Sequence, residues 1–257
     1  MLILDNIGKR YNAGTVNETC LFNGFHLEVA EGDFVSVIGS NGSGKTSILN
    51  ILCGTIPMEE GQITIRGVDI SKTKDFKRQQ TIGRVYQDPT KGTCPSMTIL
   101  ENMAIAENKG KSFFLTRGVD KKKITYYQEL LQPLNLGLED KMHTQVGLLS
   151  GGQRQALSLL MATMTPLDFL ILDEHTAALD PKTAEIIMEL TGRIVKEKKL
   201  TTIMVTHNLR YAVEYGNRLI MMHQGKIILD YSGEEKQQVQ VQELMQVFNE
   251  ISVECGN

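Results

Sequence analysis

Residues 39–46 read Gly-Ser-Asn-Gly-Ser-Gly-Lys-Thr, which is a complete match to the pattern G-x-x-x-x-G-K-[ST]. The apolar run 34–38 before this stretch is typical of a short buried strand, and residues 47–52 after it continue as an apolar helical face. A glycine-rich turn that binds nothing is the alternative, but the Lys-Thr pair and both flanks argue against it. The sequence therefore predicts a strand, a phosphate-binding loop and a helix.

The chemistry of this loop follows from its residue types. Its glycines let successive backbone N–H groups point inward, and the helix N-terminus behind them favours a polyanion. Lys45 can reach the β- and γ-phosphates of a nucleotide, and the Thr46 hydroxyl can ligate Mg²⁺. The residues predicted to hold the nucleotide here are Gly39, Ser40, Asn41, Gly42, Ser43, Gly44, Lys45, Thr46 and Ser47.

A second anion site is predicted at residues 149–153, which read Leu-Ser-Gly-Gly-Gln before a helical segment from Arg154 to about Met164. Ser150 offers a hydroxyl, Gly151 and Gly152 offer unobstructed backbone N–H groups, and the helix dipole adds a partial positive charge. Taken alone, Ser150 could be an ordinary helix N-cap. Beside a phosphate-binding loop, we expect Ser150, Gly151, Gly152 and Gln153 to contact a nucleotide.

These motifs, with the apolar run 169–172 that ends in Asp173 and Glu174, resemble the ATP-binding subunits of ABC (ATP-binding cassette) transporters over nearly the whole chain. The resemblance implies an α/β fold, in which a P-loop NTPase core carries an antiparallel β layer and an inserted α-helical subdomain. It also implies a head-to-tail homodimer. In that dimer the 149–153 signature of one copy touches the γ-phosphate held by the P-loop of the other, so that two ATP molecules are buried.

The resemblance also assigns roles to single residues. Asp173 matches the acid that holds Mg²⁺ through water, and Glu174 matches the general base that deprotonates the attacking water. His207 matches the histidine that contacts the γ-phosphate, and Gln87 matches the glutamine that senses Mg²⁺ and water. The implied catalytic residues are thus Glu174, His207 and Gln87, and the implied metal site comprises Thr46, Gln87 and Asp173.

Three further positions match the family pattern. Tyr11 matches the aromatic residue that stacks on adenine, although an aromatic ring near a strand end is usually a packing residue. Val16 is a weaker match to a ribose contact. Asp180 matches the loop that crosses the dimer interface, and Asp180-Pro181 also reads as the capped start of a helix, so that both roles can coexist.

The chain departs from the family pattern at His175, where most relatives have proline. This imidazole could be neutral and inert, or it could change the pKa of Glu174. We favour the inert interpretation, because His207 already fills the phosphate-facing role. The strings 14–18, 92–93 and 173–178 look like those of bacterial importers fed by a lipoprotein substrate-binding protein, some of which handle aromatic amino acids.

The length of 257 residues suits a single nucleotide-binding domain. Residues 1–87 and 164–257 are predicted to form the catalytic core with its β layer, and residues 88–163 the helical subdomain. The net charge of −3 gives no basic footprint for nucleic acid. Because no apolar stretch is long enough to span a bilayer, we expect a cytoplasmic chain that is peripheral to the inner face of the cell membrane.

The leading hypothesis is an ATPase that drives a separate membrane permease, for import of a small solute such as an amino acid delivered by a lipoprotein. Export is the nearest alternative. Soluble ABC ATPases are another, but the chromosome and repair forms insert long coiled coils or zinc hooks, and the translation forms carry two cassettes. Small-molecule P-loop kinases have no Leu-Ser-Gly-Gly-Gln run.

Overall fold

The computed structural model describes residues 1–111 and 118–254 of the chain. It divides into two compact units, of which the first comprises Met1–Gln79 and Lys199–Asn257 and the second comprises Gln80–Lys198. The second unit extends on both sides of the segment 88–163 that the sequence predicts as a helical subdomain. Each unit is described separately below, and the division into core and helical subdomain stays a prediction.

An antiparallel sheet occupies the N-terminal part of the first unit. Its strands are β1 (Leu2–Tyr11), β2 (Thr19–Val29), β4 (Glu60–Ile65) and β5 (Val68–Asp69), in the order β2-β1-β4-β5. From Phe25 to Val29 in β2, buried and exposed residues alternate, as expected of a sheet with one face on the core. This sheet is the β layer that the sequence predicts.

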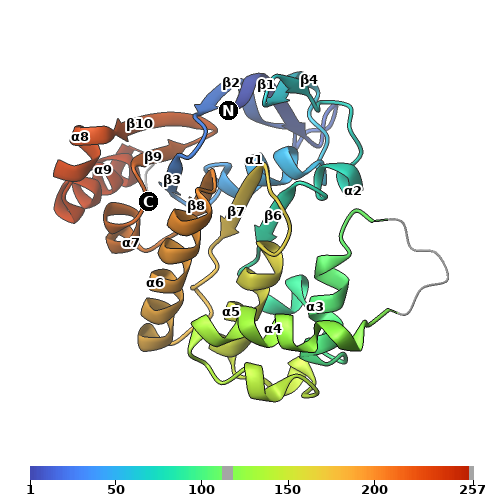
Figure 1. Cartoon of the computed structure of the whole chain (residues 1–257). Coiled ribbons are helices and arrows are strands. Elements are labelled where there is room, and N and C mark those ends of the chain that lie inside the picture. The colour runs from blue at the N-terminus through green and yellow to red at the C-terminus, as the bar shows by residue number, and fades with distance from the viewer. Residues whose placement is uncertain (112–117, 255–257) are drawn as a thin grey trace. The chain divides into compact units, whose positions relative to one another are not determined.

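The other strands of the first unit are largely parallel. They are β3 (Phe34–Gly39), β8 (Thr202–Val205), β9 (Arg218–His223) and β10 (Lys226–Ser232). Strand β3 pairs in parallel with both β8 and β9, while β9 and β10 form an antiparallel hairpin. All six residues of β3 are buried, which explains why four of them are large and apolar. Helix α1 (Lys45–Cys53) follows β3 directly (Figure 1).

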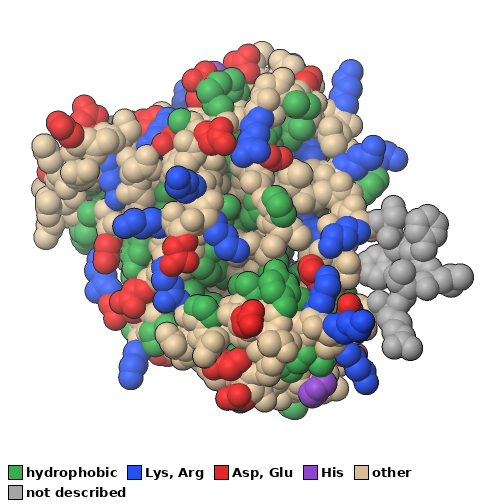
Figure 2. All heavy atoms as spheres, in the orientation of Figure 1, with side chains coloured by type: hydrophobic (Ala, Val, Ile, Leu, Met, Phe, Trp, Pro, Cys, Tyr) green, Lys and Arg blue, Asp and Glu red, His purple; other side chains and the backbone are tan. Residues whose placement is uncertain are grey.

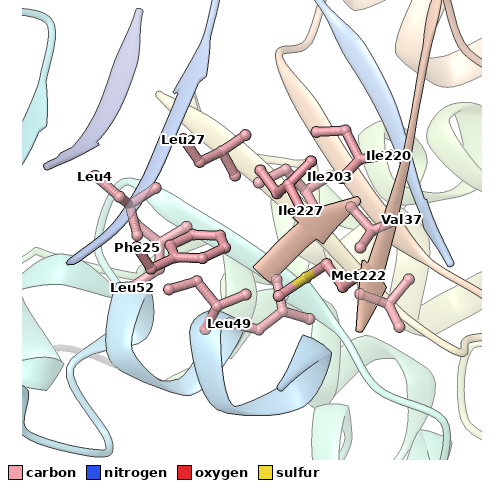
Figure 3. A pocket seen from close by; sticks show the side chains of 12 residues that line it. Leu4, Phe25, Leu27, Val37, Leu49, Leu52, Ile203, Ile220, Met222 and Ile227 are labelled. Carbon is pink, nitrogen blue, oxygen red and sulfur yellow. The ribbon is translucent and has the colours of Figure 1, made fainter. Parts of the chain in front are cut away.

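The core of the first unit lies where the two groups of strands meet α1. Figure 3 shows side chains from all three converging on one small cavity. The antiparallel sheet contributes Leu4, Phe25 and Leu27, and α1 contributes Leu49 and Leu52. The other residues lining this cavity are Val37, Ile48, Ile203, Val205, Ile220, Met222 and Ile227. Because this lining is entirely apolar, the contact stabilises the fold through the hydrophobic effect and fixes α1 against both sheets.

Short helices complete the first unit: α2 (Asp75–Arg78), α7 (Leu209–Glu214), α8 (Gly233–Gln238) and α9 (Val241–Glu254). In α9, apolar residues recur at i, i+3, i+4 and i+7 from Leu244, a spacing that predicts a helix packed on the body of the protein along one face. The structure confirms this, because Leu244, Val247, Phe248 and Ile251 lie against a core cluster that includes Leu219.

The second unit contains two parallel strands, β6 (Ile82–Val85) and β7 (Phe169–Asp173), with Val85 opposite Leu172. Its α-helices are α3 (Ile99–Glu107), α4 (Ile124–Leu131), α5 (Gly151–Ala162) and α6 (Pro181–Lys198). The 3₁₀ turns are η1 (Pro89–Gly92), η2 (Lys121–Lys123), η3 (Gln132–Leu134), η4 (Glu139–Lys141) and η5 (Val146–Leu148). Residues 156–160 of α5 are all buried, in line with their mostly apolar sequence.

The face drawn in Figure 2 carries basic and acidic side chains interspersed with one another. Among the helices of residues 1–111 and 118–254, none combines the length and the apolar character that crossing a membrane requires.

Candidate active site

The predicted phosphate loop connects β3 to α1 and depends on glycine at two points. Gly39 has a φ of 152° and Gly44 a φ of 101°, both in the region that side chains rarely adopt. A Cβ atom at Gly39 would collide with the backbone oxygen of Met222, and one at Gly44 would come within 2.8 Å of the Phe22 ring. The loop can therefore keep this path only with glycine at these positions.

The loop ends at a helix terminus that suits an anion. In the described part of the chain, no side chain caps the N-terminus of α1, and its first turn contains no acidic residue. The partial positive charge of this terminus is therefore not offset by a neighbouring carboxylate. These properties fit a nucleotide phosphate at this end of α1.

Lys45 is buried within the loop, with 5% of its surface exposed. Its ammonium donates hydrogen bonds to the backbone oxygens of Gly39, at 2.7 Å, and Ser40, at 2.9 Å. The Ser43 hydroxyl lies 3.4 Å away. A buried ammonium that turns toward the inside of its own loop supplies positive charge where phosphate oxygens are expected.

Tyr11 and Val16 have different surroundings. Tyr11 ends β1, and its hydroxyl donates a hydrogen bond to Ser47 Oγ on α1 at 3.2 Å. This bond anchors the ring beside the first turn of α1, and the stacking of Tyr11 on adenine stays a prediction. Val16 lies in the loop before β2 and is fully exposed, and its weaker assignment to the ribose stays a prediction.

His207 follows the end of β8. The parallel pairing places Val37 of β3 opposite Val205 of β8, and the Thr206 N–H donates to the Val37 carbonyl at 3.1 Å. His207 is exposed, and Asn208 after it caps α7 by accepting from the N–H groups of Arg210 and Tyr211. Because β3 and β8 are parallel, His207 and the start of the phosphate loop lie at the same sheet edge.

In the second unit too, polar residues predicted for the site follow the ends of two parallel strands, β6 and β7. Gln87 follows β6, while Asp173 ends β7 and Glu174 follows it. The register of Val85 with Leu172 brings these polar side chains to one edge. Glu174 has a φ of 49°, an unusual backbone conformation for a residue with a side chain, and such conformations cluster at functional sites.

An ion pair that the sequence did not predict lies at this edge. Nη2 of Arg84 on β6 lies 2.6 Å from Oδ2 of Asp173, and both side chains are mostly buried. The Arg84 guanidinium also lies over the Tyr86 ring, 4.7 Å from its centroid. The available signal was an arginine within the otherwise apolar strand Ile82–Val85, but its partner is 89 positions away in the sequence.

The signature residues begin helix α5. Ser150 is the N-cap, and it forms a capping box in which Ser150 Oγ accepts from the Gln153 N–H and Gln153 Oε1 accepts from the Ser150 N–H, both at 3.2 Å. The capping interpretation of Ser150 is therefore correct. It is compatible with a ligand, because a hydroxyl that accepts one hydrogen bond can still donate another.

Gly151 and Gly152 lie close to the loop that contains Asp180. A Cβ atom at Gly151 would be 3.3 Å from the Leu179 side chain, and one at Gly152 would collide with the Thr183 methyl group. Asp180 Oδ1 accepts from the Thr183 N–H at 3.1 Å, and hydrogen bonds with Thr183 lower the pKa of Asp180. The structure thus brings the signature and Asp180 together, and Asp180 caps α6 as predicted.

His175 is buried and lies 3.1 Å from Thr191 Oγ1 through its Nε2. Burial lowers the pKa of His175 to about 4, so that its imidazole is neutral at pH 7. This supports the inert interpretation of His175 over a role as a charged neighbour of Glu174.

The lowered pKa of His175 predicts a pH-dependent stability. The unfolded chain binds a proton below about pH 6.5, whereas the folded chain resists protonation down to about pH 4, so stability is full above 6.5 and is lost as the pH falls. We expect this residue to account for about 3 kcal/mol of the loss. The free energy of unfolding, measured with urea at several pH values from 7 to 4, should fall less steeply with decreasing pH in His175→Gln than in the wild type. An equally steep fall in the variant would contradict this.

Comparisons with known proteins identify the family of this chain. Residues 22–177 match the family model described as "ABC transporter". The chain is 44% identical over 248 residues to a tyrosine transport ATP-binding protein of Clostridioides difficile (strain R20291), covering 96% of this chain and 98% of that relative. It is 30% identical to the phosphonates import ATP-binding protein PhnC of Lactococcus lactis subsp. cremoris (strain SK11), covering 91% of this chain and 94% of the relative.

Solved structures confirm the predicted fold class. A dimeric post-hydrolysis structure of the ATP-binding cassette MJ0796, bound to ADP and Pi, matches with a TM-score of 0.76 and 28% identity over 90% of this chain and 98% of that one. The ADP conformation of MJ1267, an ATP-binding cassette of an ABC transporter, matches with a TM-score of 0.80 and 25% identity over 100% and 99%. The chain therefore belongs to the ABC transporter family, as an ATP-binding subunit whose ATPase activity is coupled to transport.

Proposed function

We propose that this chain drives the import of an aromatic amino acid, tyrosine or a close analogue, through a separate membrane permease. The observation that carries this proposal is the 44% identity, over nearly the whole of both chains, to a protein named for tyrosine transport. The second relative described above is also named for import. Import of a small solute is therefore favoured over export.

In this proposal the nucleotide is held by residues around the P-loop and by residues of the 149–153 signature with Asp180. The P-loop backbone and Lys45 bind the phosphates, because the N-terminus of α1 and the buried ammonium supply positive charge. The Tyr11 ring stacks on adenine, in keeping with its anchoring to Ser47. The full set is Tyr11, Val16, Gly39, Ser40, Asn41, Gly42, Ser43, Gly44, Lys45, Thr46, Ser47, Ser150, Gly151, Gly152, Gln153 and Asp180.

Hydrolysis is proposed to depend on three residues. Glu174 accepts the proton of the attacking water through its carboxylate, and His207 and Gln87 orient that water by hydrogen bonding. Thr46, Gln87 and Asp173 offer the hydroxyl, amide and carboxylate oxygens that Mg²⁺ prefers. When bound, Mg²⁺ would neutralise charge that develops on the phosphate oxygens.

The working assembly is proposed to be a head-to-tail homodimer on a permease, at the inner face of the cell membrane. The N-terminus of α5, with Ser150 and two glycines, offers groups that could bind the phosphate of a nucleotide held by the P-loop of a second copy. A similar cassette forms a dimer with ADP and Pi bound. A substrate-binding lipoprotein outside the membrane would deliver the amino acid.

Uptake of labelled tyrosine tests this proposal. In a strain lacking this chain, tyrosine uptake at low external concentration should fall, and it should return with the wild-type chain but not with Glu174→Gln. Uptake of a branched-chain amino acid by the same cells is the control and should not change. Normal tyrosine uptake in the deletion strain would contradict the proposed substrate.

A further inference from the structure

The ion pair between Arg84 and Asp173 is an unusual feature of the second unit. Arg84 lies on β6, and the parallel pairing of β6 with β7 lets its side chain reach the end of the neighbouring strand. Nη2 of Arg84 lies 2.6 Å from Oδ2 of Asp173. The two side chains are only 10% and 13% exposed, so water screens their interaction weakly.

The guanidinium of Arg84 is held from a second direction. Its central carbon lies 4.7 Å from the centroid of the Tyr86 ring, a stacking geometry that suits a planar cation. The Tyr86 carbonyl in turn accepts a hydrogen bond of 3.1 Å from Nε2 of Gln155, which is fully buried in α5. Arg84 therefore keeps its charge at a fixed place beside the Asp173 carboxylate.

This position matters because Asp173 is the acid that we propose for Mg²⁺, and the inference rests on that proposal. We propose that Arg84 is a positioning residue that acts through Asp173: its guanidinium and Mg²⁺ compete for the same carboxylate. The ion pair would then weaken the binding of Mg²⁺ and raise the Mg²⁺ concentration at which nucleotide is retained.

Two effects of Arg84 oppose each other, and their sizes decide the direction. The guanidinium orients the carboxylate, which favours metal binding, but Asp173 has few rotatable bonds and is itself the last residue of a buried strand. The guanidinium also places a positive charge next to a divalent cation in a poorly screened site, where like charges repel strongly. The repulsion outweighs the orientation.

Arg84 and Mg²⁺ compete for one carboxylate, so each should weaken the binding of the other to Asp173 by the same factor, because a coupling between two binding events acts equally in both directions. Without Mg²⁺, loss of Arg84 should destabilise the fold by leaving Asp173 buried without this partner. With Mg²⁺ and nucleotide, the metal should replace much of what was lost. An arginine with only a structural role would lower stability equally under both conditions.

Arg84→Met tests this, because methionine is unbranched and uncharged. The half-saturating Mg²⁺ concentration for ADP binding, measured by calorimetry, should fall by about tenfold relative to wild type. The rise in melting temperature from ADP with Mg²⁺, relative to ADP with EDTA, should be larger in the variant. Arg84→Lys keeps the charge but loses the planar stacking on Tyr86, so in both measurements it should fall between Arg84→Met and wild type.

The controls separate failure of this inference from failure of the proposed site. When Asp173→Asn is present, adding Arg84→Met should have no further effect on the Mg²⁺ dependence, because the shared carboxylate is gone. If the wild-type protein binds ADP independently of Mg²⁺, the assignment of Asp173 fails and the inference fails with it. If Mg²⁺ dependence is normal but Arg84→Met leaves the half-saturating concentration unchanged or raises it, the inference alone is overturned.

A second variant covers the case in which Arg84→Met does not fold. Tyr86→Leu removes the ring under the guanidinium but keeps both charges. The less restrained Arg84 should compete less well, and the half-saturating Mg²⁺ concentration should fall by a smaller factor in the same direction. No shift in this variant would also overturn the inference.

Discussion

Glu174→Gln should slow ATP hydrolysis by about 10²–10⁴-fold, the usual contribution of a positioned general base, while ATP still binds. Glutamine keeps the shape and hydrogen-bonding capacity of the side chain but lacks a basic carboxylate. The position of Glu174 after β7, with its φ of 49°, fixes the direction of this side chain through the backbone, which the substitution leaves in place. Release of inorganic phosphate at saturating ATP measures the effect.

The neighbouring residue provides a matched control. His175→Gln also replaces a titratable side chain with an amide, but this imidazole is buried and neutral, so hydrolysis should stay close to the wild-type rate at pH 7. Near-normal turnover of Glu174→Gln would assign the base to another group, and a slow His175→Gln would then identify it.

Lys45→Ala should weaken nucleotide binding itself by about 10- to 100-fold, because a hydrogen bond to a charged group contributes about 1.5–3 kcal/mol. The buried ammonium neutralises phosphate charge in the ground state as well as in the transition state, so the defect should appear before any chemistry occurs. Titration with a fluorescent ATP analogue measures the dissociation constant directly.

Lys77→Ala is the matched control for Lys45→Ala. It removes the same charge from the same unit, but Lys77 lies exposed on α2. Its nucleotide affinity should equal that of the wild type. If Lys45→Ala bound ATP as tightly as Lys77→Ala does, the P-loop assignment would be wrong.

The parts of the fold that sequence could predict are those whose evidence is local. The P-loop motif predicts both the strand before it and the helix after it, and β3 and α1 lie at those positions. The continuous apolar run 169–172 likewise predicts β7, and the apolar stripe from Leu244 predicts the packing of α9. Fold class and family follow, because the motifs occur in a fixed order along the chain.

The parts that sequence could not predict depend on pairing between distant segments. Arg84 meets Asp173 only because β6 and β7 are neighbours in a specific register, which no local pattern encodes. The burial of His175 against Thr191 is similar, since it requires α6 to lie beside the end of β7. The proximity of Gly152 to Thr183 adds a packing requirement to a residue that the sequence analysis assigned to the ligand alone.

In the proposed assembly, ATP is bound between two copies of this chain, with the P-loop of one copy facing the N-terminus of α5 of the other. Light scattering of Glu174→Gln measures this directly, because blocked hydrolysis lets the ATP-bound form accumulate. With ATP and Mg²⁺ we expect a dimer that retains two ATP molecules, and with Ser150→Arg added we expect a monomer. A Glu174→Gln protein that binds ATP but stays monomeric, or a dimer that is indifferent to Ser150→Arg, would contradict the claim.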